Sequence, residues 1–165
     1  MKLKYKQYLY TAAIFVVFLV MDYITKAAIE ANFYYGERLD VLGSFVQLTL
    51  IYNRGGVFGI MQGHQGFFLV VSSIVFVMLL VFFVLEKQKN WMFCTAMGLI
   101  FSGAIGNILD RLMGKPGVVD FVYIGDDSIY RWPAFNVADM AIVCGAIMLV
   151  IVFYFTGKKA GDIAE

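Results

Sequence analysis

Long apolar runs without a charged side chain dominate the pattern of hydrophobic and polar positions along the chain. Residues 67–85, 91–109 and 140–157 contain no Asp, Glu, Lys or Arg. A helix needs about 20 mostly apolar residues to cross the hydrocarbon layer of a membrane. The pattern therefore predicts membrane-spanning helices over about 67–85, 91–110 and 137–157.

A fourth apolar run lies near the N-terminus and ends in charge. Residues 7–21 are uncharged, and the segment then continues through Asp22 and Lys26 to Ala28. A cleaved signal peptide would close its short apolar region with a small-residue site of the A-x-A type. Such a site does not close this segment, so we expect a retained first helix over about 7–28.

Basic residues flank the four runs unevenly. Lysines lie before the first run, between the second and third, and after the fourth: Lys2, Lys4, Lys6, Lys87, Lys89, Lys158 and Lys159. Because short loops rich in Lys and Arg stay on the cytoplasmic side, both termini are predicted to be cytoplasmic. The connections 29–66 and 110–139 are then expected on the outer side, although they also carry some basic residues.

The two outer connections have the composition of strands and turns. Residues 45–52 are rich in β-branched and aromatic side chains, and Asn-Arg-Gly-Gly at 53–56 is a turn signal before residues 57–61. A second extended run covers 118–124 and is followed by a turn at 125–128. A small sheet is therefore expected outside the membrane.

These elements predict an all-α membrane protein, a bundle of four transmembrane helices with a small extracytoplasmic β-sheet and loop at the outer face. The outer β-region is expected at about 36–63, and residues 1–165 are expected to form a single polytopic domain. Composition agrees, since 61% of the residues are hydrophobic and 15% are charged, against about 45–50% and about 25% in soluble domains. With a net charge of only +1, nucleic acid is not expected as a partner.

The reactive residue types that the sequence offers exclude several catalytic mechanisms. His64 is the only histidine and lies in a Gln-Gly-His-Gln-Gly loop without a nucleophile motif beside it, so we interpret it as a solvated residue rather than a catalytic base. Cys94 and Cys144 lie inside apolar runs, and both are expected to pack as small apolar residues. The sequence shows neither a zinc-ligand spacing nor a phosphate-binding loop, so no metal and no cofactor are expected.

Aspartates remain, and they gather near the predicted outer ends of the helices. The four are Asp22, Asp110, Asp120 and Asp139. An ionisable group at membrane depth costs at least a few kcal/mol, so its default interpretation is functional. Two carboxyl groups held close together share a proton, and one can then act as general base while the other acts as general acid in peptide hydrolysis. Spacing alone does not select the pair.

Polar neighbours accompany three of these aspartates. They are Lys26 for Asp22, Asn107 and Arg111 for Asp110, and Asn136 for Asp139. Asp22 and Lys26 are four residues apart with the acid first, so they can pair on one helix face, in a structural as readily as a catalytic role. An acid at the start of a helix also suits the positive helix end, which leaves an ordinary structural interpretation open for Asp139.

Five segments resemble, in order, the signature segments of the lipoprotein signal peptidase (signal peptidase II) family. They are Asp-Tyr-Ile-Thr-Lys at 22–26, Asn-Arg-Gly at 53–55, Gly-Asn-Ile-Leu-Asp-Arg at 106–111, Val-Val-Asp-Phe at 118–121 and Phe-Asn-Val-Ala-Asp at 135–139. The last two are the most specific. The resemblance implies that Asp120 and Asp139 are the catalytic dyad of an aspartic-type peptidase. The residues that it implies as support for the site are Asp22, Lys26, Asn53, Gly55, Asn107, Arg111, Asn136 and Ala138.

The same resemblance implies the partners and the location. The substrate would be a diacylglyceryl-modified prolipoprotein, cleaved on the amino side of its lipidated cysteine in the bacterial cytoplasmic (inner) membrane, with membrane lipid around the enzyme. Cyclic peptide antibiotics such as globomycin would be inhibitors. Two departures from the family pattern are Gly56-Val57, where two small residues are more common, and Met140, where a small polar residue is more common.

Two other functions are weighed against the peptidase. Transporters usually have repeated halves and a binding site near the bilayer midplane, whereas this chain has unlike outer loops and acids near one end of its helices. A noncatalytic assembly factor would be supported only by the small residues that recur on a helix face at Gly98, Ser102 and Gly106.

Overall fold

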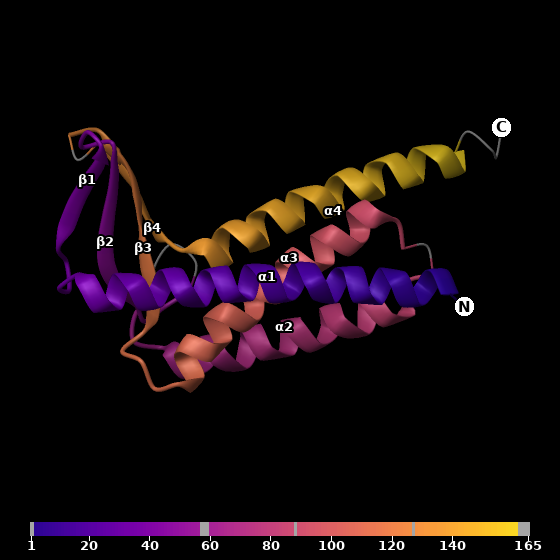
Figure 1. The fold of residues 1–165 in the computed structure, drawn as a ribbon, viewed down its shortest axis with the longest axis horizontal. Helices are drawn as coiled ribbons and strands as arrows, with labels where there is room; N and C mark the ends of the chain where they lie inside the picture. Colours follow the sequence, from indigo (N-terminus) through magenta and orange to yellow (C-terminus); the bar gives the residue numbers. More distant parts are fainter. Residues whose placement is uncertain (1, 57–59, 88, 127, 162–165) are drawn as a thin grey trace.

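Four long helices form the body of the computed structural model, which describes residues 2–56, 60–87, 89–126 and 128–161, with side chains inside the terminal helices described between residues 5 and 155. The helices are α1 (Lys2–Asn32), α2 (Gln65–Leu85), α3 (Trp91–Leu112) and α4 (Val137–Gly161) (Figure 1). Each contains a segment long and apolar enough to cross a membrane: Tyr5–Asn32, Gln65–Leu85, Trp91–Leu112 and Val137–Phe155. The predicted four-helix membrane fold is confirmed.

Helix α3 is the centre of the bundle, whereas α2 is peripheral. Inside the structure, 67% of the most apolar window of α3 is buried, against 6% for α2. Glycines allow the neighbours of α3 to approach closely, as small residues do in membrane helices. A Cβ atom on Gly103 would lie 2.2 Å from the carbonyl oxygen of Ala138 in α4, and one on Gly98 would lie 2.9 Å from Ile14 in α1.

The two cysteines differ in their surroundings. Cys94 in α3 is buried, as expected, but Cys144 in α4 is exposed, so the prediction that both pack inside is wrong for Cys144. Its neighbour Val143 is also 57% exposed, which places this side of α4 on the outside of the bundle. The sequence of α4 did not reveal this side, because lipid tails are as apolar as the side chains in a membrane bundle.

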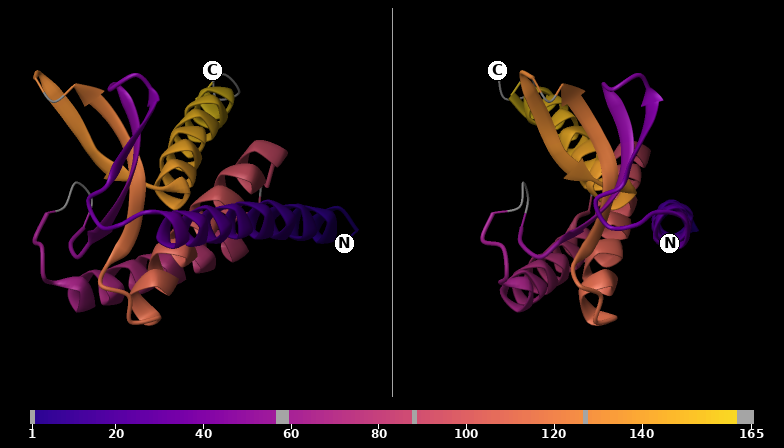
Figure 2. Two further views of the ribbon diagram at one scale, coloured as in Figure 1. Left: turned by 60° about the vertical axis from the view of Figure 1, so that its left-hand side comes forward. Right: turned by 90° about the vertical axis from the view of Figure 1, so that its left-hand side faces the viewer.

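The outer connections meet in one antiparallel sheet of four strands in the order β1-β2-β3-β4. The strands are β1 (Arg38–Leu42), β2 (Val46–Asn53), β3 (Val118–Asp126) and β4 (Tyr130–Phe135). Figures 1 and 2 show the sheet across one end of the helices, beyond the end of α1 and the start of α4. The pairing of β2 with β3 therefore joins the two outer connections into a single layer.

The segment after the Asn-Arg-Gly-Gly turn does not continue the sheet in the described residues. Val57 lies outside them, and residues 60–63 form turns. A backbone hydrogen bond of 2.9 Å from the Gly56 N–H to the Ile60 carbonyl closes this loop. Strand β2 pairs with β1 and with β3.

A small apolar cluster packs the sheet against the helices. It contains Ile29 from α1, Leu50 from β2, Val119 and Phe121 from β3, and Val137 from α4. Neighbouring residues of a strand point to opposite faces. Because Val119 and Phe121 pack into this cluster, Asp120 is turned away from it.

Candidate active site

The four aspartates noted in the sequence converge on one polar cluster below the sheet. Asp22 comes from α1, Asp110 from α3, Asp120 from β3 and Asp139 from the first turn of α4. Hydrogen bonds through Lys26, Asn107 and Asn136 connect all of them. The expected convergence at one end of the bundle is therefore observed.

Asp120 is the more deeply buried of the two acids of the implied dyad, with 2% of its surface exposed. Its Oδ1 accepts a hydrogen bond of 2.8 Å from Asn136 Nδ2, and its Oδ2 accepts one of 3.1 Å from Asn53 Nδ2. Burial and the negative charge of Asp139 raise the pKa of Asp120 well above its usual range, although both amides and Lys26 act in the opposite direction. Burial and the neighbouring carboxylate thus shift the balance of Asp120 toward its neutral form.

Asp139 lies in the first turn of α4, where its carboxylate takes part in helix capping. The Asp139 N–H donates to Asn136 Oδ1 at 2.8 Å, and Asp139 Oδ2 accepts from the Asn136 N–H at 3.1 Å. This reciprocal pair is a capping box. The remaining Oδ1 accepts a hydrogen bond of 2.8 Å from Asn107 Nδ2. The positive end of the helix favours the ionised carboxylate.

Asn136 joins the two acids. Its side chain is 0% exposed, and its Nδ2 lies 2.8 Å from Asp120 Oδ1, 3.1 Å from the Val119 carbonyl and 3.1 Å from Asn107 Oδ1. Its backbone N–H and its Oδ1 meanwhile hold Asp139. One buried residue therefore fixes β3, α3 and α4 around the carboxyl pair.

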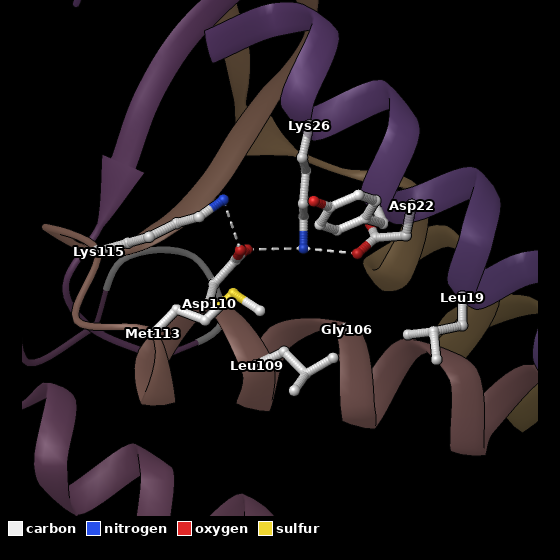
Figure 3. Close-up of a pocket in the computed structure, with 9 residues that line it drawn as sticks. Leu19, Asp22, Lys26, Gly106, Leu109, Asp110, Met113 and Lys115 are labelled. Atoms are coloured by element: carbon white, nitrogen blue, oxygen red, sulfur yellow. Dashed lines mark ion pairs between the residues drawn. The ribbon is translucent and has the colours of Figure 1, made fainter.

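Lys26 neutralises the helix side of the cluster. Its Nζ lies 2.8 Å from Asp22 Oδ2, 2.8 Å from Asp110 Oδ2 and 3.2 Å from Asn107 Oδ1, which uses all three protons of the ammonium group. Figure 3 shows Lys26 between Asp22 and Asp110, in a small hollow that Leu19 and Leu109 also line. The predicted pairing of Asp22 with Lys26 is confirmed.

Asp22 also reaches α4 directly. Its Oδ1 accepts a hydrogen bond of 2.9 Å from the Ala138 N–H. A Cβ atom on Gly106 would lie 2.5 Å from Asp22 Oδ2 and 3.3 Å from the Ala138 Cβ. Ala138 and Gly106 are therefore small because the Asp22 carboxylate occupies the space between α3 and α4.

Asp110 belongs to the cluster although it was not among the residues assigned to support the site. Besides Lys26, it binds Lys115 Nζ at 3.0 Å and accepts from the Val119 N–H at 3.3 Å. Lys115 also pairs with Glu30 Oε2 at 2.7 Å. Burial lowers the pKa of Lys115, but its bonds to Glu30 and Asp110 outweigh this effect, and the net shift is upward. In the sequence Asp110 was marked by its position near a helix end and by its place in the 106–111 signature segment, whereas Lys115 and Glu30 had no such signal.

A loop after β2 covers the other side of the pair. Arg111 donates from Nη1 to the Asn107 carbonyl at 3.0 Å and from Nη2 to the Gly55 carbonyl at 3.1 Å. Asn53 Oδ1 accepts from the Gly55 N–H at 3.0 Å and from Gln62 Nε2 at 3.2 Å. Every residue assigned to the site from the sequence thus lies in or against the cluster, and Gln62 is an addition that the sequence pattern did not indicate.

Three residues singled out in the sequence lie outside the cluster, and His64 is solvent-exposed as expected. The His64 side chain does not cap α2. Met140, one of the departures from the family pattern, is 42% exposed. A Cβ atom on Gly56, the other described departure, would lie 2.3 Å from the Phe68 ring. Glycine at position 56 therefore makes room for this aromatic side chain.

The fold and the cluster define a class of protein, a multi-pass membrane enzyme with two carboxyl groups bridged by Asn136 at one end of its helix bundle. The structure is similar to that of a bacterial membrane enzyme solved by the in meso method at 2.3 Å resolution, with a TM-score of 0.81, 31% sequence identity and 90% coverage of each chain. A second bacterial membrane enzyme, solved at 1.9 Å, gives a TM-score of 0.75 at 32% identity, covering 87% of this chain and 91% of the other.

Sequence comparison then gives the family. Residues 14–155 match the family model described as Signal peptidase (SPase) II. The chain is 34% identical to the lipoprotein signal peptidase of Staphylococcus haemolyticus (strain JCSC1435) over 88% of its own length and 92% of the relative. It is also 34% identical to that of Staphylococcus carnosus (strain TM300) over 91% and 93% of the two chains. The protein belongs to the signal peptidase II family, an aspartic-type peptidase family, which confirms the resemblance.

Proposed function

We propose that Asp120 and Asp139 are the catalytic pair with which this signal peptidase II removes signal peptides from prolipoproteins. The observation that carries the proposal is the bridge through Asn136, a buried residue whose side-chain Nδ2 donates to the Asp120 carboxyl group and whose backbone N–H donates to the Asp139 carboxylate. Acids from a strand and from a helix start are thereby held at one place. Such pairs supply an acid and a base without a nucleophilic side chain.

The surroundings of the two acids divide their roles. Asp120 is buried and its pKa is raised, so we assign it the neutral role, whereas Asp139 is half-buried at the start of α4, where the positive helix end suits the charged role. Asp139 takes a proton from a water molecule as that water attacks the scissile carbonyl carbon. Asp120 donates a hydrogen bond to the developing oxyanion and then gives its proton to the leaving amine as the C–N bond breaks. A proton exchange between the acids and solvent restores the starting state.

The position of the pair favours a lipidated substrate. We propose that the enzyme cleaves on the amino side of a diacylglyceryl-modified cysteine. The cluster lies at one end of the membrane helices α1, α3 and α4, next to strand β3 of the sheet. The acyl chains of the substrate can remain in the bilayer while the peptide bond reaches the acids. Globomycin is proposed as an inhibitor that binds at the same place.

We further propose that the sheet and the site face outward from the bacterial cytoplasmic membrane, with both termini in the cytoplasm. The lysines near both termini and between α2 and α3 support this orientation. The test is a chain with Cys94→Ala and Cys144→Ala that carries either Ser128→Cys or Lys6→Cys. A membrane-impermeant maleimide on intact spheroplasts is expected to label only Cys at position 128, and labelling only at position 6 would reverse the orientation.

The decisive experiment on the catalytic pair uses the purified enzyme and a diacylglyceryl-modified prolipoprotein. Asp120→Asn and Asp139→Asn are each expected to lose at least about 1,000-fold in cleavage rate, because each removes one proton-transfer group. Thermal unfolding in detergent checks that both variants are folded. Full activity in either folded variant would exclude the assigned pair. Ion flux in liposomes that depends on Asp139, without any cleavage, would support a transporter instead.

A further inference from the structure

We propose that Gln62 is a positioning residue of this peptidase, which orients the Asn53 amide so that its NH2 group, rather than its oxygen, faces Asp120. This inference rests on the proposed catalytic role of Asp120. Gln62 lies in the turn before α2 and contacts the Asn53 side chain and the Arg54 backbone N–H. It acts through Asn53.

The contacts of Asn53 distinguish the two ends of its amide. Oδ1 accepts from the Gly55 N–H at 3.0 Å and from Gln62 Nε2 at 3.2 Å. Nδ2 donates to Asp120 Oδ2 at 3.1 Å and to the Gly56 carbonyl at 3.2 Å. A reversed amide would place an oxygen against the Asp120 carboxyl group and would place its NH2 group against two donors. The observed orientation is therefore the one that satisfies the donors and acceptors.

The orientation of Gln62 is itself fixed by the backbone. Its Oε1 accepts a hydrogen bond of 3.1 Å from the Arg54 N–H, so its NH2 end is directed at Asn53. A Cβ atom on Gly55 would lie 3.2 Å from Gln62 Nε2, which shows how closely the side chain lies against the loop. A backbone N–H thus orients Gln62, Gln62 orients Asn53, and Asn53 presents a donor to Asp120.

This chain of contacts affects the proton on Asp120. A hydrogen bond from Asn53 favours the ionised form of Asp120 and lowers its pKa. If that bond weakens, Asp120 keeps its proton to higher pH. The charged groups that act on Asp120 are Lys26 from α1, Arg111 from α3 and Asp139 from α4. A change at Gln62 leaves all three in place, so an altered pH profile reports on Asn53.

The test is the pH profile of the cleavage rate at limiting concentration of the lipidated prolipoprotein. The alkaline limb of this profile, the fall in cleavage rate at high pH, reports loss of the Asp120 proton. Gln62→Met keeps the length of the side chain but removes its amide, and it is expected to move this limb upward by up to about one pH unit. Gln65→Met is the matched control, because Gln65 donates to the Lys115 carbonyl instead, and its limb is expected at the wild-type position.

A second comparison separates positioning from a general effect on the fold. In a chain that already carries Asn53→Ala, adding Gln62→Met is expected to change neither the limb nor the rate further. Gln62→Ala repeats the test with a smaller side chain, and thermal unfolding verifies each variant. The inference would be overturned if the alkaline limb of Gln62→Met stays at the wild-type position. It would also be overturned if Gln62→Met lowers the cleavage rate equally in chains with Asn53 and with Asn53→Ala. Asp120→Asn would remain inactive in both cases. Activity in Asp120→Asn would instead refute the catalytic assignment itself.

Discussion

Asn107 and Asn53 perform the same task on opposite sides of the carboxyl pair, yet they are held by different chemistry. Each donates from Nδ2 to an aspartate, Asn107 to Asp139 at 2.8 Å and Asn53 to Asp120 at 3.1 Å. Asn107 Oδ1 is held by the Lys26 ammonium group and by buried Asn136. Asn53 Oδ1 is held by two neutral donors, the N–H of buried Gly55 and the side chain of exposed Gln62. The helix side is thus held by buried charge, whereas the loop side is held by uncharged groups, one of which is exposed to solvent.

The largest effect is expected from breaking the helix side at Lys26. Lys26→Ala leaves Asp22 and Asp110 buried without their shared cation, and removing one partner of a buried ion pair costs about 3–5 kcal/mol. Thermal or denaturant unfolding in detergent measures this loss. Activity of the folded fraction is expected to fall less than in the Asp120 or Asp139 variants.

A second change supplies the control for Lys26. Adding Asp22→Asn to Lys26→Ala removes one uncompensated charge, and part of the lost stability is expected to return. A Lys26→Ala variant as stable as the wild type would show that the helix side is not locked by charge. Equal inactivity of well-folded Lys26→Ala and Asp139→Asn would show that Lys26 contributes more than support.

An intermediate effect is expected on the loop side. Asn53→Ala removes one hydrogen bond to Asp120, which corresponds to about a tenfold loss of cleavage rate, with the alkaline limb moved upward. Because the bond belongs to a loop, the free energy of unfolding is expected to change by less than about 1 kcal/mol. A loss of stability as large as that of Lys26→Ala would remove the distinction between the two sides.

The smallest effect is expected at the rim of the charged cluster. Lys115 pairs with Glu30 at 2.7 Å and with Asp110 at 3.0 Å, but its side chain is 21% exposed. Lys115→Met is expected to cost about 1 kcal/mol of stability, since solvent screens such pairs, and to leave cleavage within a few-fold of wild type. High salt should reduce the difference in stability. A severe loss of activity would show that Lys115 belongs to the helix side of the site, which is held by buried charge.

Much of the fold was predictable because membrane helices leave long charge-free runs and because residues four apart on a helix share a face. These signals gave the four helices and the pairing of Asp22 with Lys26. The sheet was only partly predictable, since the pairing of β2 with β3 depends on contacts between segments far apart in sequence. Local turn signals likewise could not reveal that residues 60–63 fold back instead of extending the sheet.

The candidate site was predictable where residue type itself limits the role. Buried acids and their amide neighbours stand out in an apolar sequence, and the signature segments selected Asp120 and Asp139 among them. Gln62 and Glu30 are ordinary loop or helix-end polar residues in the sequence, so only spatial proximity reveals them. The exposed side of Cys144 was hidden because apolar side chains face both lipid and protein in this bundle.

The hydrogen bond from the Ala138 N–H to Asp22 spans 116 residues of sequence. The first helix therefore completes the start of the last one, and the last one brings Asp139. During translation, a nascent chain that has inserted only its first three spans lacks Asp139. Under the proposed catalytic assignment, the enzyme is therefore expected to gain activity only when its final helix enters the membrane.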